Sequence, residues 1–90
     1  QPIRAALLVL HDARGEPLPL GTRVRLLGGS GQQGMVGYDG ETYFDSLEPH
    51  NTLEASTPQG TCRVRFDHAD DGHNSIPRIG PLICTQENTP

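Results

Sequence analysis

Short apolar runs separated by clusters of glycine and proline dominate this sequence and limit what it can fold into. The chain has 90 residues with 11 Gly and 8 Pro, and its longest apolar run, Ala5 to Leu10, is only as long as a strand. Runs of this length bounded by turn residues are typical of β-strands, whereas a disordered chain would lack them. We therefore expect an all-β fold, either a β-sandwich or a small, partly open barrel.

Alternation of apolar and polar residues with a period of two marks the individual strands. In residues 22–27, for example, Val24 and Leu26 face one side while Arg23 and Arg25 face the other. Seven strands are expected on this basis, covering residues 4–11, 22–27, 34–38, 41–45, 51–56, 61–67 and 82–85. Asp39-Gly40 predicts a hairpin between the third and fourth strands, because glycine tolerates the positive φ of such a turn.

The segments between the strands are polar or rich in proline. Residues 16–21 carry two prolines and are expected to form a loop or an edge segment, since each proline removes a hydrogen-bond donor. Within this segment Leu18 and Leu20 are either exposed apolar contacts or a lid over the core, and we favour the lid. Residues 68–80 should be a polar loop, and residues 86–90 a flexible tail.

The inward side chains should form a single core, because a chain of this length does not divide into two. With two Phe, two Tyr and no Trp, that core must consist mainly of Leu, Val and Ile. The side chains expected inside are Val24, Leu26, Phe44, Leu53, Val64 and Phe66. We therefore expect one domain over residues 1–90, with its core between residues 3 and 85.

Cys62 and Cys84 are the only two cysteines. Two ligands do not close a tetrahedral zinc site, and no C-x-x-C spacing is present, so a disulfide is favoured over a metal site. A disulfide implies a compartment outside the cytoplasm. Closing a loop of this length would contribute about 3 kcal/mol in the chain-entropy model, a large share for so small a domain.

The charge and hydropathy of the chain disfavour two classes of function. A net charge of −4 argues against nucleic-acid binding, which needs a concentrated basic surface. No apolar stretch approaches the roughly 20 residues of a membrane-spanning helix. The chain begins with Gln1 and shows no signal peptide, so we expect a fragment or a processed chain whose targeting information lies elsewhere.

Candidate chemical sites are few. The run from His68 to His73 holds two His and two Asp, a mixture that can bind a divalent metal, but an acidic loop of this kind is more often a solvated connection. A triad of Ser46 or Ser75, His50 and an Asp can be written down, yet no G-x-S-x-G context supports it. The glycines at 28–31 lack the lysine and helix of a phosphate loop. We expect no metal site, no cofactor and no catalysis.

Four arginines form the most informative polar pattern. Arg23, Arg25, Arg63 and Arg65 alternate with apolar residues and should all face away from the core. Together they would form a basic stripe on an acidic domain and could bind an acidic protein surface or another domain of the same protein. The simpler alternative is that they only solvate a strand face.

Three features together resemble a known family. The first is LLVLHDARGEPLPLGTRVRL, from Leu7 to Leu26: a strand, a D-x-x-G turn, a proline-rich segment and a second strand. The second is MVGYDGETYFDSL, from Met35 to Leu47, in which V-G precedes the Asp-Gly turn and an aromatic strand leads to Leu. The third is the late cysteine pair, Cys62 and Cys84. In order and spacing, the chain is similar to the C-terminal domain of outer-membrane fimbrial ushers, which assemble pili by the chaperone–usher pathway.

The resemblance implies a seven-stranded β-sandwich on the periplasmic face of the outer membrane that is not an enzyme and needs no cofactor. Its implied partners are periplasmic chaperone–pilus subunit complexes and the other domains of the same usher. Any membrane contact would run through the membrane-spanning barrel of the usher, outside this chain. Transthyretin-like and adhesin-type modules share the first two features, so a structural spacer is the alternative function.

Overall fold

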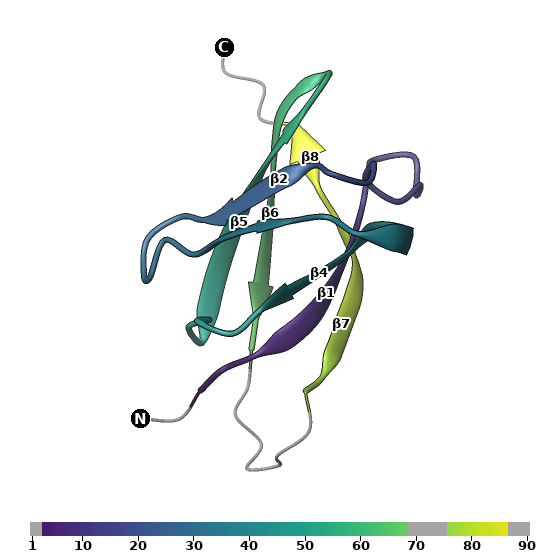
Figure 1. Cartoon of the computed structure of the whole chain (residues 1–90). Helices are drawn as coiled ribbons and strands as arrows, with labels where there is room; N and C mark the ends of the chain where they lie inside the picture. The colour runs from purple at the N-terminus through teal and green to yellow at the C-terminus, as the bar shows by residue number, and fades with distance from the viewer. Residues whose placement is uncertain (1–2, 69–75, 87–90) are drawn as a thin grey trace.

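The computed structural model describes residues 3–68 and 76–86, which form two β-sheets packed around one core (Figure 1). In chain order the elements are β1 (Ala6–His11), β2 (Arg23–Leu26), β3 (Gln33–Met35), the 3₁₀ turn η1 (Tyr38–Gly40), β4 (Glu41–Phe44), β5 (His50–Thr57), β6 (Gly60–Asp67), β7 (Arg78–Ile83) and β8 (Thr85–Gln86). None of the described residues belongs to a helix long and apolar enough to cross a membrane. The expected all-β class is confirmed.

The two sheets differ in size and in strand direction. The larger sheet has the order β3-β2-β5-β6-β8, and every neighbouring pair in it is antiparallel. The smaller sheet has the order β4-β1-β7, in which β4 is antiparallel to β1 and β7 is parallel to it. The central strand of the smaller sheet therefore pairs with a strand from the middle of the chain and with one from near its end.

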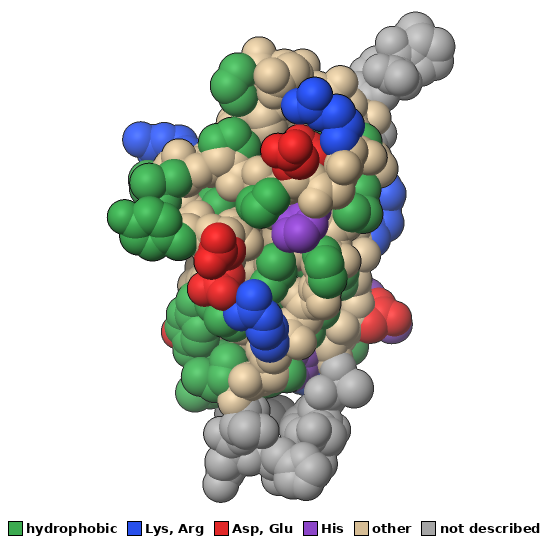
Figure 2. Space-filling model, turned by 90° about the vertical axis from the view of Figure 1, so that its right-hand side faces the viewer, with side chains coloured by type: hydrophobic (Ala, Val, Ile, Leu, Met, Phe, Trp, Pro, Cys, Tyr) green, Lys and Arg blue, Asp and Glu red, His purple; other side chains and the backbone are tan. Residues whose placement is uncertain are grey.

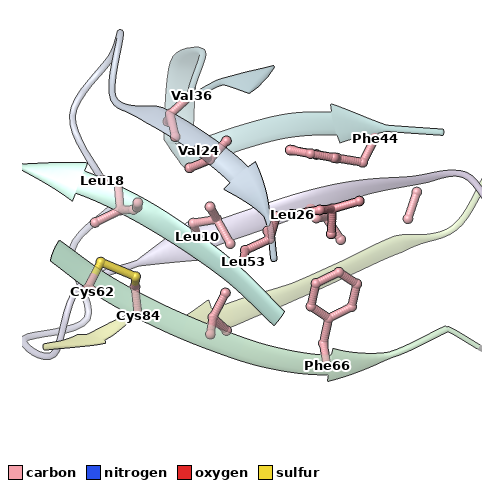
Figure 3. Packing of buried hydrophobic residues seen from close by; sticks show 14 of the residues in the cluster. Leu10, Leu18, Val24, Leu26, Val36, Phe44, Leu53, Cys62, Phe66 and Cys84 are labelled. Atoms are coloured by element: carbon pink, nitrogen blue, oxygen red, sulfur yellow. A yellow bond between two sulfur atoms is a disulfide. The ribbon is translucent and has the colours of Figure 1, made fainter. Parts of the chain in front are cut away.

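The core lies between the sheets and takes alternate residues from the long strands β1, β5 and β6 and from β2 (Figure 3). All of the side chains expected inside are buried, and Phe44 has no exposed surface at all. Its neighbour Tyr43 is 48% exposed, as the alternation along β4 requires. Gly34 packs against the Phe44 ring, where an added Cβ would lie 3.1 Å from Cε1 and Cζ. The absence of a side chain at Gly34 therefore makes room for the largest group in the core.

The expected hairpin at Asp39-Gly40 is wrong in its pairing, although the turn itself is present. Asp39 and Gly40 both have positive φ, at 58° and 77°. However, β3 pairs with β2 in the larger sheet, whereas β4 pairs with β1 in the smaller one. The turn thus carries the chain from one sheet to the other. Local sequence identifies a tight turn, but it does not say which sheet the next strand joins.

The end of the chain also differs from expectation, because the last expected strand, 82–85, is divided between the two sheets. β7 already begins at Arg78, inside the segment expected to be a loop, and runs through Pro81 as an edge strand. At Cys84 the chain crosses to the larger sheet, where β8 pairs with β6 and includes Gln86, the first residue of the expected tail. Eight strands therefore replace the expected seven in the part of the chain that the structure describes.

The proline-rich segment after β1 covers one end of the core. Leu18 is only 4% exposed, and its backbone N–H donates to the carbonyl oxygen of Leu10 at 3.0 Å. Leu20 is 64% exposed. The lid role is therefore confirmed for Leu18 and wrong for Leu20.

A disulfide closes the same end of the core (Figure 3). Cys62 on β6 bonds to Cys84, which lies between β7 and β8, and both cysteines are 3% exposed. The bond predicted from the cysteine count is confirmed. Because Cys84 is the point where the chain changes sheets, the disulfide joins the larger sheet to the end of the smaller one.

Candidate interaction surfaces

The residues suggested as catalytic are not assembled into a site. His50 Nδ1 lies 2.9 Å from Asp67 Oδ1 at an exposed end of the β5–β6 pair, whereas the Ser46 hydroxyl donates to Asp45 Oδ1 at 3.3 Å. Among the described residues no hydrogen bond joins Ser46 to His50, and no group of three acidic, His or Cys side chains is arranged to hold a metal. Ser75 lies outside the described residues.

His68 has a structural contact instead of a place in a metal cluster. Its side chain is buried, with 8% exposed, and Nε2 lies 2.9 Å from the carbonyl oxygen of Ala5. Its backbone N–H donates to the carbonyl oxygen of Pro49 at 2.9 Å. The ring therefore attaches the end of β6 to the chain just before β1. The rest of the suggested cluster, residues 69–73, lies outside the described residues.

The four arginines lie on the outer face of the larger sheet, as the alternation predicted. Arg23 and Arg25 project from β2, and Arg63 and Arg65 project from β6, with β5 between these two strands. Arg63 is partly buried and the other three are exposed. We call this surface, together with Glu54, the arginine face.

Glu54 on β5 is the residue of this face that the sequence reading missed. The strand register places it opposite Arg25 on one side and opposite Arg63 on the other. Arg25 Nη2 donates to Glu54 Oε1 at 3.0 Å, and Arg63 Nε donates to Oε2 at 3.2 Å. The hydrogen bond from Arg25 lowers the pKa of Glu54, burial acts in the opposite direction, and Arg63 adds a further lowering. The carboxylate therefore stays ionised and holds two guanidinium groups in fixed positions.

The outer face of the smaller sheet is mainly apolar. Its alternate residues, which point away from the core, pair Leu7 with Tyr43 and His11 with Ile83. Tyr43 and Ile83 are 48% and 45% exposed. Figure 2 views the molecule from the side on which β7 lies in Figure 1 and shows several groups of hydrophobic side chains there, with acidic, basic and His side chains between them. We call this surface, with Val9 at its centre, the apolar face.

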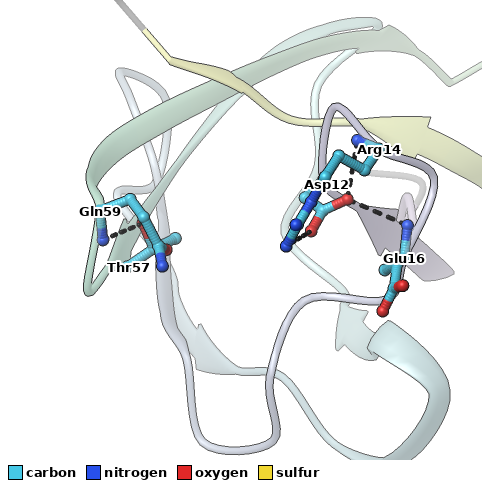
Figure 4. A network of polar contacts seen from close by, with 5 residues as sticks. All are labelled: Asp12, Arg14, Glu16, Thr57 and Gln59. Carbon is cyan, nitrogen blue, oxygen red and sulfur yellow. Dashed lines mark hydrogen bonds and ion pairs between the residues drawn. The ribbon is translucent and has the colours of Figure 1, made fainter.

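A third surface lies at the end of the domain that carries the disulfide, where there is a hollow of about 690 Å³. Figure 4 shows polar contacts in the turns beside it. The Asp12 carboxylate accepts the backbone N–H groups of Arg14 and Glu16 at 2.9 and 3.0 Å. The bond from Glu16 is the main reason that the pKa of Asp12 is lowered. Thr57 Oγ1 accepts the backbone N–H of Gln59 in the same way. These hydrogen bonds stabilise the turns in which they lie, so we assign these polar groups a structural role.

Comparison with known proteins places this arrangement in a family. A family model described as the PapC C-terminal domain matches residues 7–70. The solved C-terminal domain of the Caf1A usher aligns with a TM-score of 0.78 and 20% identity, covering 93% of this chain and 99% of that one. The PapC usher C-terminal domain aligns with a TM-score of 0.66 and 24% identity, covering 91% of this chain and 99% of that one. No curated protein sequence matches the chain.

The two solved domains share the fold of this chain, and the family match covers well over half of its length. The family indicated by the sequence motifs is therefore confirmed by an independent comparison. The chain belongs to the PapC C-terminal domain family and is a C-terminal domain of an outer-membrane usher of the chaperone–usher pathway of pilus assembly.

Proposed function

We propose that this domain binds chaperone–subunit complexes on the periplasmic side of the outer membrane while a pilus is assembled. The single observation that carries the proposal is the apolar face, because it exposes Tyr43 near one end and Ile83 near the other, and half-exposed apolar side chains on the outside of a small domain suit contact with another protein. Tyr43 is the strongest contact residue, since a half-exposed tyrosine offers a large, rigid apolar area with a polar tip.

The relatives support the proposal. The Caf1A structure is described by the statement that conserved hydrophobic clusters on the surface of that domain are important for F1 antigen assembly. The apolar face is the corresponding kind of surface in this chain. The role is one of binding, not of catalysis, and it requires no cofactor.

A binding experiment with matched variants tests the proposal. The probe is the purified periplasmic chaperone–subunit complex of the same pilus system, titrated into the 90-residue chain by calorimetry. Tyr43→Asp and Ile83→Asp each remove an apolar contact and place a charge on the apolar face. Each should weaken binding about tenfold or more, because losing a central contact of an interface costs over about 1 kcal/mol of binding free energy. Gln59→Asp, at an exposed position in the turn between β5 and β6, adds the same charge away from the apolar face and should bind as the wild type does.

The alternative function, a structural spacer, gives the opposite result. A spacer would not bind the complex, and ushers carrying Tyr43→Asp would assemble pili normally. Absence of binding by the wild-type chain, together with normal pilus assembly by the variant usher, would therefore exclude the proposed function.

A further inference from the structure

A hollow of about 380 Å³ lies on the arginine face, beside the edge strand β3. The register brings its walls together in two rows, with Arg23 between Met35 and Ser56, and Arg25 between Gln33 and Glu54. The side chains that line it and that matter for recognition are Arg23, Arg25, Gln33, Met35, Glu54 and Ser56. The hollow therefore combines two guanidinium groups, one carboxylate, two uncharged polar groups and one thioether.

The two arginines of the hollow retain donors for a ligand. A guanidinium group has five N–H donors. Arg25 directs Nη2 to Glu54, which fixes the position of its guanidinium group. The side chain of Arg23 makes no hydrogen bond or ion pair with the residues that the structure describes, and it is exposed. One arginine is thus held in place and the other is available beside it.

We infer that this hollow binds a carboxylate of an acidic, extended segment of a partner protein. The local charge carries the argument: the arginine face holds four arginines on a chain whose net charge is −4. Arginine pairs with carboxylates through two parallel N–H donors, which selects a planar anion with defined geometry. The hollow would be a second contact surface, on the sheet opposite the apolar face. For the identity of the physiological partner, the inference therefore rests on the proposed function.

The composition of the hollow favours a protein segment over an anionic membrane. Met35 is 55% exposed and gives the hollow an apolar wall that suits the stem of a glutamate or a neighbouring apolar side chain. Gln33 and Ser56 supply hydrogen-bonding groups that suit a peptide backbone.

The test uses a short synthetic peptide of alternating Glu and Ser, with a Gln–Ser peptide as the ligand control. Binding to the ¹⁵N-labelled 90-residue chain is followed by amide chemical shifts. Arg23→Glu should weaken binding of the Glu peptide about tenfold or more, since it removes a charge-assisted contact and adds repulsion. Arg14→Glu makes the same charge change at a side chain that is 85% exposed, in the turn after β1, and should leave binding within about twofold of the wild type. Since the side chain of Arg23 has no hydrogen bond or ion pair with the described residues, its replacement should leave the melting temperature nearly unchanged.

The inference is overturned if Arg23→Glu binds the Glu peptide like the wild type, or if both charge variants lose binding equally. It is also overturned if vesicles of phosphatidylglycerol, and not the peptide, bind in an Arg23-dependent way. Failure of the chaperone–subunit complex to bind, with peptide binding intact, would remove the proposed function and leave this inference standing. If the complex bound equally to the wild type and to Arg23→Glu, and the peptide did not bind, this inference would be overturned and the proposed function would stand.

Discussion

The Arg78 guanidinium lies 2.6 Å from the Glu41 carboxylate, although the two residues belong to opposite edge strands of the smaller sheet. The ion pair between Nη1 and Oε2 must therefore pass over β1, the strand that separates β7 from β4. Val9 is paired with Glu41 and is only 5% exposed, although it points away from the core. The ion pair is thus a cover over the middle of the apolar face.

A double-mutant cycle with Arg78→Ala and Glu41→Gln measures what this cover contributes. Both side chains are partly exposed, at 56% and 34%, so we expect a coupling free energy of about 0.2–1 kcal/mol in urea unfolding. Raising the salt concentration should reduce the coupling, because exposed charges are screened. A coupling that does not respond to salt would show that the ion pair does not carry it.

Phe44→Ala should be among the most destabilising single changes. The ring has no exposed surface, and deleting it leaves a cavity between the sheets, so the expected loss is about 3–5 kcal/mol of unfolding free energy. Tyr43→Ala, on the adjacent outward position of β4, is the matched control and should cost less than about 1.5 kcal/mol. Similar losses for the two variants would contradict the assignment of faces.

Gly40→Ala tests the turn between the sheets. Gly40 has a φ of 77°, and an added Cβ would collide with the carbonyl oxygen of Leu10. Gly15 has a φ of 83° and nothing within 4 Å of such a Cβ, so Gly15→Ala isolates the cost of the backbone conformation, about 1–2 kcal/mol. Gly40→Ala should cost about 1–3 kcal/mol more than this control. Equal melting temperatures for the two variants would disprove the close contact.

Replacing Cys62 and Cys84 by Ser should lower stability by about 3 kcal/mol, because the bond closes a loop with a sequence separation of 22 residues. Denaturant unfolding of the double variant gives the value. Mass spectrometry without reductant provides the check on the starting material, which should contain no free thiol. Undiminished stability would show that the loop is already restricted by other contacts.

Acidification should weaken the domain partly through Glu54. Its pKa in the folded state is lowered below 4.5, first by the hydrogen bond from Arg25, so the ionised form stabilises the fold above about pH 4.5. That contribution is lost as the pH falls through the lowered pKa. The difference in unfolding free energy between the wild type and Glu54→Gln should therefore shrink as the pH falls below 4.5. A difference that stays constant with pH would refute this role.

Alternation within single strands could be predicted from the sequence, because a period of two decides which side chains point inward. That is why Val24, Leu26 and Phe66 were placed correctly. The sheet that each strand joins could not be predicted, because it depends on contacts far apart in the chain. The positions of β4 and β7 beside β1 are the clearest examples.

The sequence contains a signal for one of the two contacts of Glu54. The hairpin turn at residues 57–60 fixes the register of β5 and β6, since Thr57 pairs with Gly60. Counting back from this pair places Glu54 opposite Arg63. Its second contact, with Arg25, depends on the pairing of β2 with β5, for which the sequence holds no comparable turn.

The parallel pairing of β1 with β7 has a consequence for the order in which the chain can fold as it is made. β1 emerges first, but one of its two neighbours is supplied only after Arg78 to Ile83 have appeared. Until then β1 has one open edge, and the nearby apolar residues lack part of their cover. Contacts of such long sequence separation form late and slowly. The smaller sheet is thus completed only after β7 has been made, and until then the open edge of β1 is a place where a strand of another chain could pair.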